Sequence, residues 1–463
     1  MLSRIRKQIF SFTSSRKDYP IIAGLASGLF PFIHYYSSNF IRFNSWQHLF
    51  YFALTFLLLP STVFFFFHRI LKSNYSFYKY LIPILNLSVF GLFIVWGIYG
   101  MKKKILLITL VFAFFLAFLL YRHIKKIIVF QFLLATIAFL MFIPKLFIYL
   151  EYDDEWMTQP DDIEEVVFKK QPNIYLIQPD GYANLLELKT GNYNFDNSKF
   201  ELFLKNKGFT IYDNYRSNYG YTLYSNSSMF SMKHHYYKNP IKNGNDLYDF
   251  RKVIIEKNPV ISIFNANNYK THLILEEPYI LLNMPKMGYD YCNIDYNTIP
   301  YMSRGFDMGM DILNEMETLI NTNKVTNNFY FIEKLIPGHI RVNSLFSKGV
   351  EKERKYYLER LKKSNEWLNE LVEIITQNDP NGIILIASDH GGYVGFKNTD
   401  QSLIKTHDRV LINSIFSSIL AIKWSYNQVP EFENELKSPI NLFRFIFSYL
   451  SENDKYLKFL QED

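Results

Sequence analysis

The sequence predicts a helical membrane domain followed by an α/β domain with a mainly parallel central sheet. Two observations support this division. Residues 20–150 are almost continuously apolar and rich in Phe and Leu, whereas residues 151–463 hold most of the acidic residues. In the second part, short apolar runs alternate with amphipathic stretches of helical length, which is typical of parallel strands joined by helices. We therefore expect a multi-pass membrane domain over 1–150, an acidic linker over 151–172 and a soluble domain over 173–463.

Apolar stretches in the first part approach the roughly 20 residues that a membrane-spanning helix needs. Five such stretches occur, at about 20–36, 48–68, 80–100, 104–122 and 126–150. The first is the weakest, because Gly24, Gly28 and Pro31 interrupt it. The sequence therefore predicts about five spans.

The basic residues of the first part set the expected orientation. The N-terminus is basic, and so are the loops at 69–79 and 122–126. Such loops favour the cytoplasmic side, although the basic loop at 102–104 breaks the pattern. With five spans and a cytoplasmic N-terminus, the soluble domain lies outside the cytoplasm.

Charge and cysteine content exclude several classes of function. The net charge of +7 does not indicate a nucleic-acid partner, since much of the positive charge flanks apolar segments. The single cysteine, Cys292, excludes an internal disulfide and a cysteine zinc cluster. Lys145 is the only clear ionisable residue within the expected spans, so the sequence does not favour a transporter.

Three strand-like runs of the second part end in residues that can bind a metal. "NIYLIQPDG" places Asp180 after one run, and "FYFIEKLIPGH" places His339 after another. "GIILIASDHGG" ends in Asp389 and His390, with two glycines that we expect to let the backbone turn close to a cation and substrate. The carboxyl ends of parallel strands meet at one edge of a sheet, so we expect these side chains to lie together. Taken singly, Asp180 is also explained as a turn residue and His339 as a surface histidine.

A hydroxyl-rich stretch, "NYRSNYGYTLYSNSSMFSM", places Thr222 where a helix can begin. One interpretation is a helix N-cap. In the other, the helix N-terminus favours an anionic phosphoryl group, and a divalent cation lowers the pKa of the threonine so that its alkoxide can attack. The three ligands expected nearby favour the nucleophile.

These stretches carry a family resemblance. "NIYLIQPDGYANLLEL", the segment through "SNYGYTLYSNSSMFSM", and "SNEWLNELVEIITQNDPNGIILIASDHGG" resemble the signature regions of membrane-anchored sulfatase-like hydrolases and transferases. These proteins belong to the alkaline phosphatase superfamily, which includes lipoteichoic acid synthases and phosphoethanolamine transferases. The resemblance covers about residues 172–425. It implies an alkaline-phosphatase-like or sulfatase-like α/β domain outside a bacterial cytoplasmic membrane.

The resemblance also implies roles for individual residues. Asp180 matches the first metal-binding acid, Thr222 the nucleophile that becomes phosphorylated, and Asp389 and His390 the remaining ligands. The implied cofactor is a divalent metal (Mn, Zn or Mg) at one site, with a second site left open.

Further histidines are candidates for substrate or metal binding. His339 lies near a substrate-contacting histidine of the family, although "IPGHIRV" departs from the usual Pro-His followed by Pro-Tyr. His407, in "KTHDR", is a second candidate. His234 and His235 are candidate substitutes, although such a pair after a helix more often faces solvent.

The implied reaction is phosphoryl transfer. Cys292 lacks the sequence context in which sulfatases form formylglycine, and Thr222 cannot be converted to it, which disfavours a sulfate-ester hydrolase. The resemblance implies a membrane lipid donor of phosphoglycerol or phosphoethanolamine and an envelope glycan or lipid acceptor, with hydrolysis of a phosphodiester sharing the first step. The alternatives are a catalytically degenerate binding module in envelope assembly and a transport or scaffold protein.

Overall fold

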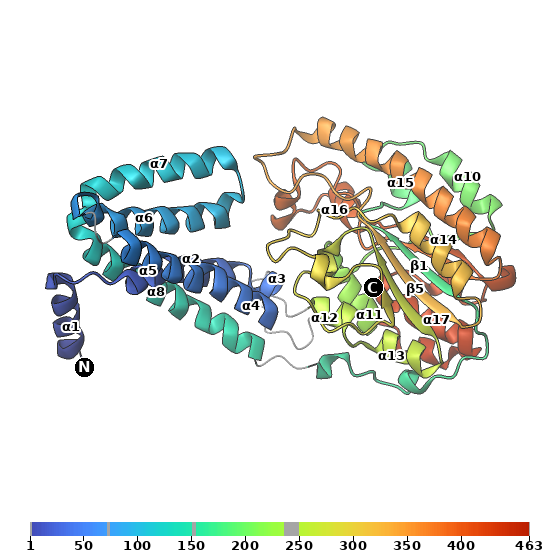
Figure 1. Ribbon diagram of the computed structural model, residues 1–463. Helices are drawn as coiled ribbons and strands as arrows, with labels where there is room; N and C mark the ends of the chain where they lie inside the picture. Colours follow the sequence, from blue (N-terminus) through green and yellow to red (C-terminus); the bar gives the residue numbers. More distant parts are fainter. Residues whose placement is uncertain (1, 72–74, 151–153, 236–249, 463) are drawn as a thin grey trace. The chain divides into compact units, whose positions relative to one another are not determined.

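The chain divides into two compact units, Met1–Tyr152 and Asp153–Asp463. The computed structural model describes residues 2–71, 75–150, 154–235 and 250–462. Figure 1 shows the first unit as a group of helices and the second as a sheet flanked by helices.

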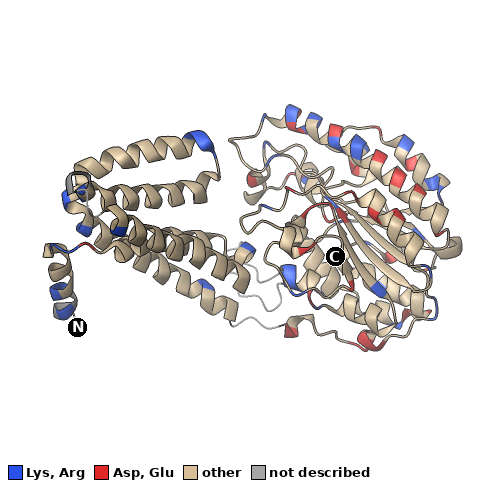
Figure 2. Cartoon of the chain, viewed as in Figure 1, with Lys and Arg blue, Asp and Glu red and all other residues tan. Residues whose placement is uncertain are grey.

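The first unit is helical. Its helices are α1 (Leu2–Ser14), α2 (Pro20–Ser38), α3 (Phe40–Phe43), α4 (Trp46–Ala53), the π-helical segment η1 (Leu54–Leu58), α5 (Leu59–Leu71), α6 (Tyr75–Tyr99), α7 (Lys103–Leu120), the 3-10 turn η2 (Tyr121–His123) and α8 (Ile124–Leu150). Figure 2 shows that basic residues of this unit gather near helix ends and that its long helices are otherwise nearly uncharged. This distribution is typical of helices that meet lipid.

Three helical segments among the described residues are long and apolar enough to cross a membrane. They are Trp46–Leu71, Tyr78–Tyr99 and Lys103–Leu150. The third holds 48 residues and contains both α7 and α8. Helix α2, the weakest of the five expected spans, is not among them. The chain therefore has membrane-capable helices, and the count of five spans stays a prediction.

The glycines that weaken α2 as a span allow its close packing. A Cβ added at Gly24 would come within 2.6 Å of the Cα of Ser61, and one added at Gly28 would overlap the carbonyl oxygen of Phe56. Small residues four apart let two helix backbones approach, as in many membrane helix pairs. The glycines do lower the hydropathy of α2, as the sequence indicated, but the sequence did not show that they allow close packing against Phe56 and Ser61.

The second unit is built on a mixed seven-stranded sheet in the order β2-β7-β6-β1-β5-β3-β4. The strands are β1 (Ile174–Pro179), β2 (Thr210–Ile211), β3 (Lys270–Leu275), β4 (Tyr291–Cys292), β5 (Asn328–Lys334), β6 (Ile383–Ala387) and β7 (Leu420–Lys423). The pairs β6-β1, β1-β5, β5-β3 and β3-β4 are parallel, whereas β7 is antiparallel to both β6 and β2. The predicted α/β architecture is confirmed, and the two-residue strands β2 and β4 were not predicted.

Helices cover both faces of the sheet (Figure 1). The longer ones are α9 (Leu185–Thr190), α10 (Ser198–Asn206), α11 (Thr222–Ser231), α12 (Phe250–Ile255), α13 (Pro259–Ala266), α14 (Ile312–Thr322), α15 (Val350–Asn378), α16 (Arg409–Phe416) and α17 (Leu442–Ser451). In β1, Ile174 and Leu176 join one buried cluster with residues of α11, α13 and α17. Tyr175 and Ile177 join another with residues of α10, α14 and α15. Burial on both faces explains why β1 is apolar at four successive positions, Ile174 to Ile177, rather than at alternating ones.

The segment expected as an acidic linker packs onto the second unit. Ile163, Val166 and Phe168 are buried in its core. Asp161 forms a bidentate ion pair with the fully buried Arg444 of α17, with both N–O distances 2.9 Å. Residues 151–153 of this segment lie outside the described residues. Over the residues that the structure describes, this acidic segment is therefore held against the second unit by its apolar side chains and by one ion pair.

Candidate metal and nucleophile site

Two parallel strands deliver three ligand-type side chains to one place. Asp180 directly follows β1, and Asp389 and His390 follow β6. The parallel register pairs Ile177 with Ile386, so the two strands end side by side. All three side chains are buried, and ligand atoms of the three lie within 4.8 Å of one another. The expected convergence at the carboxyl ends of the strands is therefore observed.

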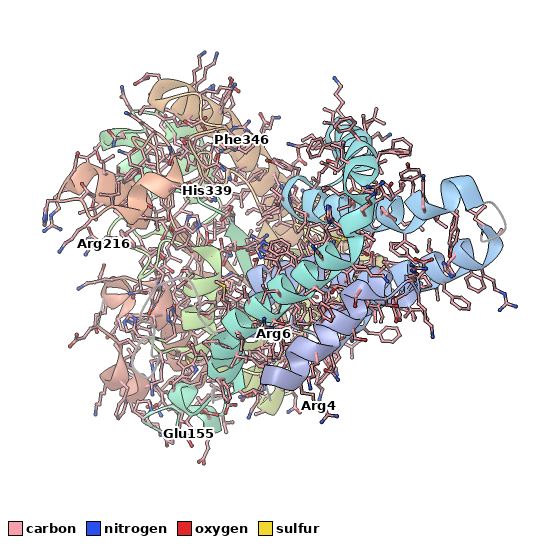
Figure 3. The ribbon with its side chains drawn as sticks, turned by 90° about the vertical axis from the view of Figure 1, so that its left-hand side faces the viewer. Arg4, Arg6, Glu155, Arg216, His339 and Phe346 are labelled. Carbon is pink, nitrogen blue, oxygen red and sulfur yellow. The ribbon has the colours of Figure 1, made fainter. Side chains whose placement is uncertain are left out.

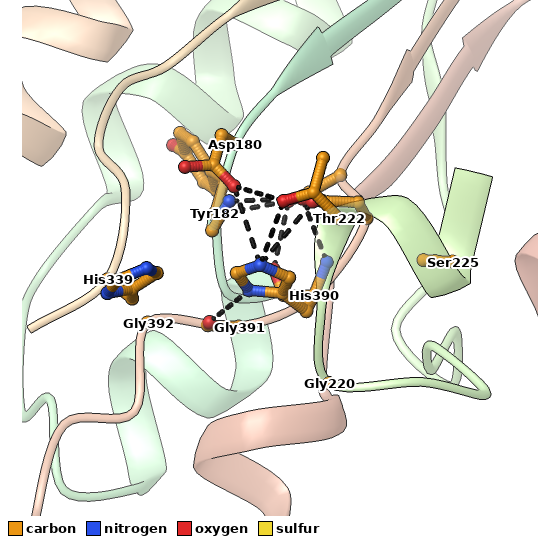
Figure 4. A network of polar contacts seen from close by, with 12 residues as sticks. Asp180, Tyr182, Gly220, Thr222, Ser225, His339, His390, Gly391 and Gly392 are labelled. Carbon is orange, nitrogen blue, oxygen red and sulfur yellow. Dashed lines mark hydrogen bonds and ion pairs between the residues drawn. The ribbon is translucent and has the colours of Figure 1, made fainter. Parts of the chain in front are cut away.

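Thr222 joins this cluster from a different element. It is the first residue of α11, and its Oγ1 donates to Asp180 Oδ1 at 3.3 Å and lies 3.5 Å from His390 Nε2 (Figure 4). The residue before it, Tyr221, occupies the N-cap position without a side-chain capping bond. The N-cap interpretation of Thr222 is therefore wrong. Its hydroxyl faces the acids at the positive end of the helix dipole.

The spacing of the four side chains fits a small divalent cation. His390 Nε2 lies 3.4 Å from Asp180 Oδ1 and 3.4 Å from Asp389 Oδ2. Thr222 Oγ1 lies 3.3 Å from Asp180 Oδ1 and 3.5 Å from His390 Nε2. Donor atoms at these four spacings agree with a shared ion of the size of Zn, which binds nitrogen and oxygen at about 2.0–2.2 Å. Asp389 Oδ2 is buried and has no hydrogen-bond partner among the described residues. Its Oδ1, by contrast, accepts from the backbone N–H groups of Gly181 and His390.

The imidazole of His390 is oriented as a ligand. Its Nδ1 lies 2.8 Å from the carbonyl oxygen of Gly391. A carbonyl can only accept, so Nδ1 carries hydrogen and the lone pair of Nε2 faces the acids. A second hydrogen bond of this kind is the usual way in which proteins fix a metal-binding histidine.

The site carries excess negative charge. Burial and the nearby Asp389 carboxylate raise the pKa of Asp180 above its ordinary value. Burial lowers the pKa of His390, but the charges of Asp389 and Asp180 outweigh it and raise the net value. Glu333, near the end of β5, is also buried, and its pKa is raised by burial and by the same two acids. A bound cation would neutralise the negative charge of these carboxylates, as is expected at a metal site.

The two glycines after His390 serve packing rather than a turn. A Cβ on Gly391 would overlap the carbonyl oxygen of Ser414, and one on Gly392 would overlap the ring of Tyr357. Neither glycine has a positive φ. The expectation that these glycines let the backbone turn beside the cation and substrate is therefore wrong. They instead allow α16 and α15 to pack closely against this loop.

His339 lies beside the cluster, on the loop after β5. Its ring centroid is 6.1 Å from that of His390. Burial and the neighbouring His390 lower the pKa of His339 to about 4. Its Nδ1 lies 2.6 Å from the carbonyl oxygen of Ile340, so Nδ1 carries hydrogen and Nε2 is the free acceptor.

The remaining candidate histidines lie apart from the cluster. His407 is exposed in the loop before α16, and no contact among the described residues joins it to Asp180, Asp389 or His390. His234 and His235 are buried, contrary to the expected solvent-facing pair. Their rings pack around Tyr219, with centroids 5.9 and 4.3 Å away.

Cys292 lies in β4, at the edge of the sheet farthest from β2. Burial raises the pKa of its thiol to about 11. Three strands, β1, β5 and β3, lie between β4 and β6, the strand that leads to Asp389 and His390. This position agrees with the sequence argument that the cysteine takes no part in sulfate-ester chemistry.

Several residues that hold the site were not found from the sequence. Ser388 Oγ accepts from the N–H of Tyr182 and donates to the carbonyl of His390, which ties the ends of β1 and β6 together. Tyr357 OH donates to the carbonyl of Gly181 at 2.9 Å. Arg360 donates to the carbonyl of His339 at 2.9 Å. Ser388 precedes the Asp-His pair and so had a local signal, whereas Tyr357 and Arg360 lie on a regular amphipathic helix and had none.

Comparison with known proteins yields structural neighbours only. The sequence matches no protein-family model and no curated protein. Lipooligosaccharide phosphoethanolamine transferase A from Neisseria meningitidis, an integral membrane protein, is similar over 93% of this chain and 95% of its own, with 12% identity and a TM-score of 0.43.

Two further neighbours match a smaller share of the chain. The periplasmic domain of EptC from Escherichia coli, in complex with Zn, covers 62% of this chain and 85% of its own, with 12% identity and a TM-score of 0.43. The lipoteichoic acid synthase LtaP from Listeria monocytogenes covers 63% and 76%, with 12% identity and a TM-score of 0.40. These are the classes of protein that the sequence motifs resemble. At such identities and TM-scores the likeness carries no functional argument, which rests instead on the residues of the site.

Proposed function

We propose that the second unit is a metal-dependent phosphotransferase or phosphodiester hydrolase with Thr222 as its nucleophile. The observation that carries this proposal is the position of Thr222 Oγ1, 3.3 Å from Asp180 Oδ1 and 3.5 Å from His390 Nε2, at the first residue of a helix. A structural threonine has no need of two buried ligand-type side chains around its hydroxyl.

Asp180, Asp389 and His390 would hold the metal, with Thr222 as the fourth donor. A divalent Mn, Zn or Mg ion there supplies Lewis acidity and lowers the pKa of the threonine hydroxyl. A second metal would need ligands beyond these, and His407 does not reach the cluster in the described residues.

The side chains of the site then account for a two-step transfer. Thr222 Oγ1 forms a bond to the phosphorus of a phosphodiester, the bond from phosphorus to the leaving alcohol breaks, and solvent protonates the leaving oxygen. Asp180 Oδ1 accepts the hydrogen bond of the Thr222 hydroxyl. Because this oxygen would also hold the cation, the proton of the hydroxyl passes to solvent as the threonine attacks. The N–H groups at the positive end of the α11 dipole favour the anionic phosphoryl group. In the second step a hydroxyl of the acceptor, or water, attacks the phosphothreonine and Thr222 leaves.

His339 is proposed to contact the substrate as a hydrogen-bond acceptor rather than as an acid. Its lowered pKa leaves the ring neutral near pH 7, and its Nδ1–H is engaged by the carbonyl of Ile340. The acceptor Nε2 therefore suits a hydrogen bond from the attacking hydroxyl in the second step, whereas a pKa of about 4 makes it a weak base near pH 7. His407 remains a proposed substrate contact only.

The membrane-capable helices favour transfer over hydrolysis. They would hold the enzyme at a bilayer, where a phospholipid is the abundant phosphodiester. We propose five spans, domains at 1–150 and 173–463, and a location in a bacterial cytoplasmic membrane with the second unit outside. The donor headgroup would be phosphoglycerol or phosphoethanolamine, and the acceptor an envelope glycan or lipid.

The test is detection of the covalent intermediate. The full-length protein is incubated with Mn, Zn or Mg and vesicles that contain phosphatidylglycerol and phosphatidylethanolamine, then quenched in acid and mapped by mass spectrometry. We expect a headgroup phosphate on Thr222, and none after chelation of the metal.

Two variants define the specificity of that result. Thr222→Ala must abolish the adduct, whereas Ser225→Ala must retain it, because the Ser225 hydroxyl lies one turn further along α11 and is 3.1 Å from Ser217 Oγ. If no adduct forms with any of the metals supplied, the transferase proposal fails and a binding module becomes the better interpretation.

A further inference from the structure

Two loops at the carboxyl-end edge of the sheet expose an unusual amount of apolar surface. We define the rim surface as residues 341–348, which follow β5, and residues 397–409, which follow the metal-ligand loop. Its large apolar side chains are exposed by 51 to 87% of their surface: Val342, Leu345, Phe346, Leu403 and Ile404. Water-exposed apolar groups gathered in this way normally mark a site of contact.

The two loops form one structure. Backbone N–H groups of Thr399 and Asp400 donate to the carbonyls of Arg341 and Val342 at 3.0 and 2.9 Å. Ser347 Oγ also donates to the carbonyl of Lys397. The apolar side chains are thus carried by a hydrogen-bonded pair of loops rather than by a single free segment.

The charge of the rim surface favours an anionic partner. Its basic residues outnumber its acidic residues by five to two: Arg341, Lys348, Lys397, Lys405 and Arg409 against Asp400 and Asp408. All five basic side chains are exposed. Phe and Leu interspersed with Lys and Arg are typical of segments that lie in the headgroup region of a membrane, where the apolar groups are buried and the cations meet anionic lipids.

The rim surface adjoins the candidate site. His339 lies two positions before it on the loop after β5, and Figure 3 labels both His339 and Phe346 on this loop. The sequence also links the second unit closely to a membrane-capable helix. The apolar helix α8 ends at Leu150, and the second unit starts at Asp153. We propose that the rim surface inserts its apolar side chains into the surface of an anionic bilayer and presents the metal and nucleophile site to lipid headgroups.

The experiment is depth-dependent fluorescence quenching in the full-length protein. With Cys292, the single cysteine, replaced by Ala, Leu345→Cys is labelled with an environment-sensitive nitrobenzoxadiazole probe. The labelled protein is placed in vesicles of phosphatidylglycerol and phosphatidylethanolamine that contain spin-labelled lipid. The matched control is Val325→Cys, which is 98% exposed and precedes β5, at the opposite end of the same strand.

We expect quenching at position 345 to be several-fold stronger than at position 325. It should weaken in neutral phosphatidylcholine vesicles and after Leu403→Asp with Ile404→Asp, two exposed positions at which folding should be unaffected. Equal quenching at positions 345 and 325 would overturn the proposal. So would a blue-shifted probe at position 345 that the lipid label does not quench, because another protein or a second copy of the chain would then cover the surface.

This readout does not depend on the reaction. Thr222→Ala should leave the quenching at position 345 unchanged. Membrane contact by the rim surface and nucleophilic catalysis by Thr222 can therefore fail separately.

Discussion

The two units bury polar side chains in opposite ways. In the first unit, the amides of Asn86 and Gln131 exchange two hydrogen bonds of 2.9 Å, and Asn86 also donates to the carbonyl of Ala23 at 2.8 Å. In the second unit, Asp180 and Asp389 converge on one histidine, and an oxygen of Asp389 has no hydrogen-bond partner among the described residues. Mutual hydrogen bonds hold elements together, whereas surplus buried charge of one sign is relieved by protonation or by a bound cation.

The largest expected effect comes from removing that surplus charge. Asp389→Asn keeps the shape of the side chain but removes a negative ligand. We expect the metal content of the purified protein, measured by inductively coupled plasma mass spectrometry, to fall by at least about tenfold, since even indirect perturbation of a ligand costs 10 to 100-fold in affinity. The headgroup adduct on Thr222 should disappear as well.

Asp379→Asn is the matched control for this change. Asp379 lies before β6, at its other end, and accepts from Asn173 and Tyr175 at 2.8 and 2.9 Å. Its metal content should match the wild type. In chelator, Asp389→Asn should unfold at the same or a higher temperature than wild type, because repulsion between the two acids is relieved. Unchanged metal content in Asp389→Asn would refute the site.

The buried ion pair of the second unit should give the next largest effect. Asp161→Ala leaves the guanidinium of Arg444 buried without its carboxylate, which costs about 3–5 kcal/mol of unfolding free energy. Chemical denaturation measures this loss. The metal content should not change, because the pair stabilises the segment after the membrane helices rather than the site.

Replacement of both partners separates charge from packing. Asp161→Leu with Arg444→Met should recover much of the lost stability, since a well-packed apolar pair can replace a buried ion pair. A loss below about 1 kcal/mol in Asp161→Ala would mean that the pair behaves like a surface ion pair.

A smaller effect is expected from the amide pair of the first unit. Asn86→Leu leaves the amide of Gln131 without its partner between α6 and α8, and we expect a loss of about 1 kcal/mol, the usual scale for hydrogen bonds between membrane helices. Thermal unfolding in detergent measures it. Asn86→Leu with Gln131→Leu should regain part of the loss, and a double variant less stable than the single one would contradict this account.

Local sequence signals predicted the parts of the site that lie on strand ends. β1 is apolar from Ile174 to Ile177 and β6 is apolar throughout, and an acid follows each strand within two residues, so Asp180 and Asp389 could be placed without a structure. Thr222 was found because a polar stretch preceded a helix. Tyr357 could not be found in this way, because its role is a hydrogen bond to Gly181, 176 positions away, and nothing in an amphipathic helix marks one tyrosine as the donor.

Buried polar groups were the least predictable feature. Glu333 is the penultimate residue of β5 and was included in its strand-like run, although it is buried and its pKa is raised by burial and by the charges of Asp180 and Asp389. Asn86 and Gln131 are single amides within apolar helices, and only their tertiary pairing shows that they form a contact. Gly24 and Gly28 weakened the predicted span by hydropathy, because hydropathy does not record how closely two helices can approach.

The smallest effect tests whether an unpaired buried carboxylate is sufficient for a site. Glu187 of α9 is buried, one of its oxygens has no hydrogen-bond partner among the described residues, and burial raises its pKa to about 7. Unlike Asp389, it belongs to no group of ligands that the described residues form.

A raised pKa in the folded state favours folding below the unfolded value of about 4.5, and this advantage is lost as the pH rises through about 7. Glu187→Gln should therefore unfold at a higher temperature than wild type at pH 8 and at the same temperature near pH 4.5, with unchanged metal content. Glu201→Gln, at a half-exposed position of α10 where the carboxylate pairs with Lys205, should show no such dependence on pH. A lower metal content in Glu187→Gln would contradict this account, because a single buried acid would then bind metal without converging ligands.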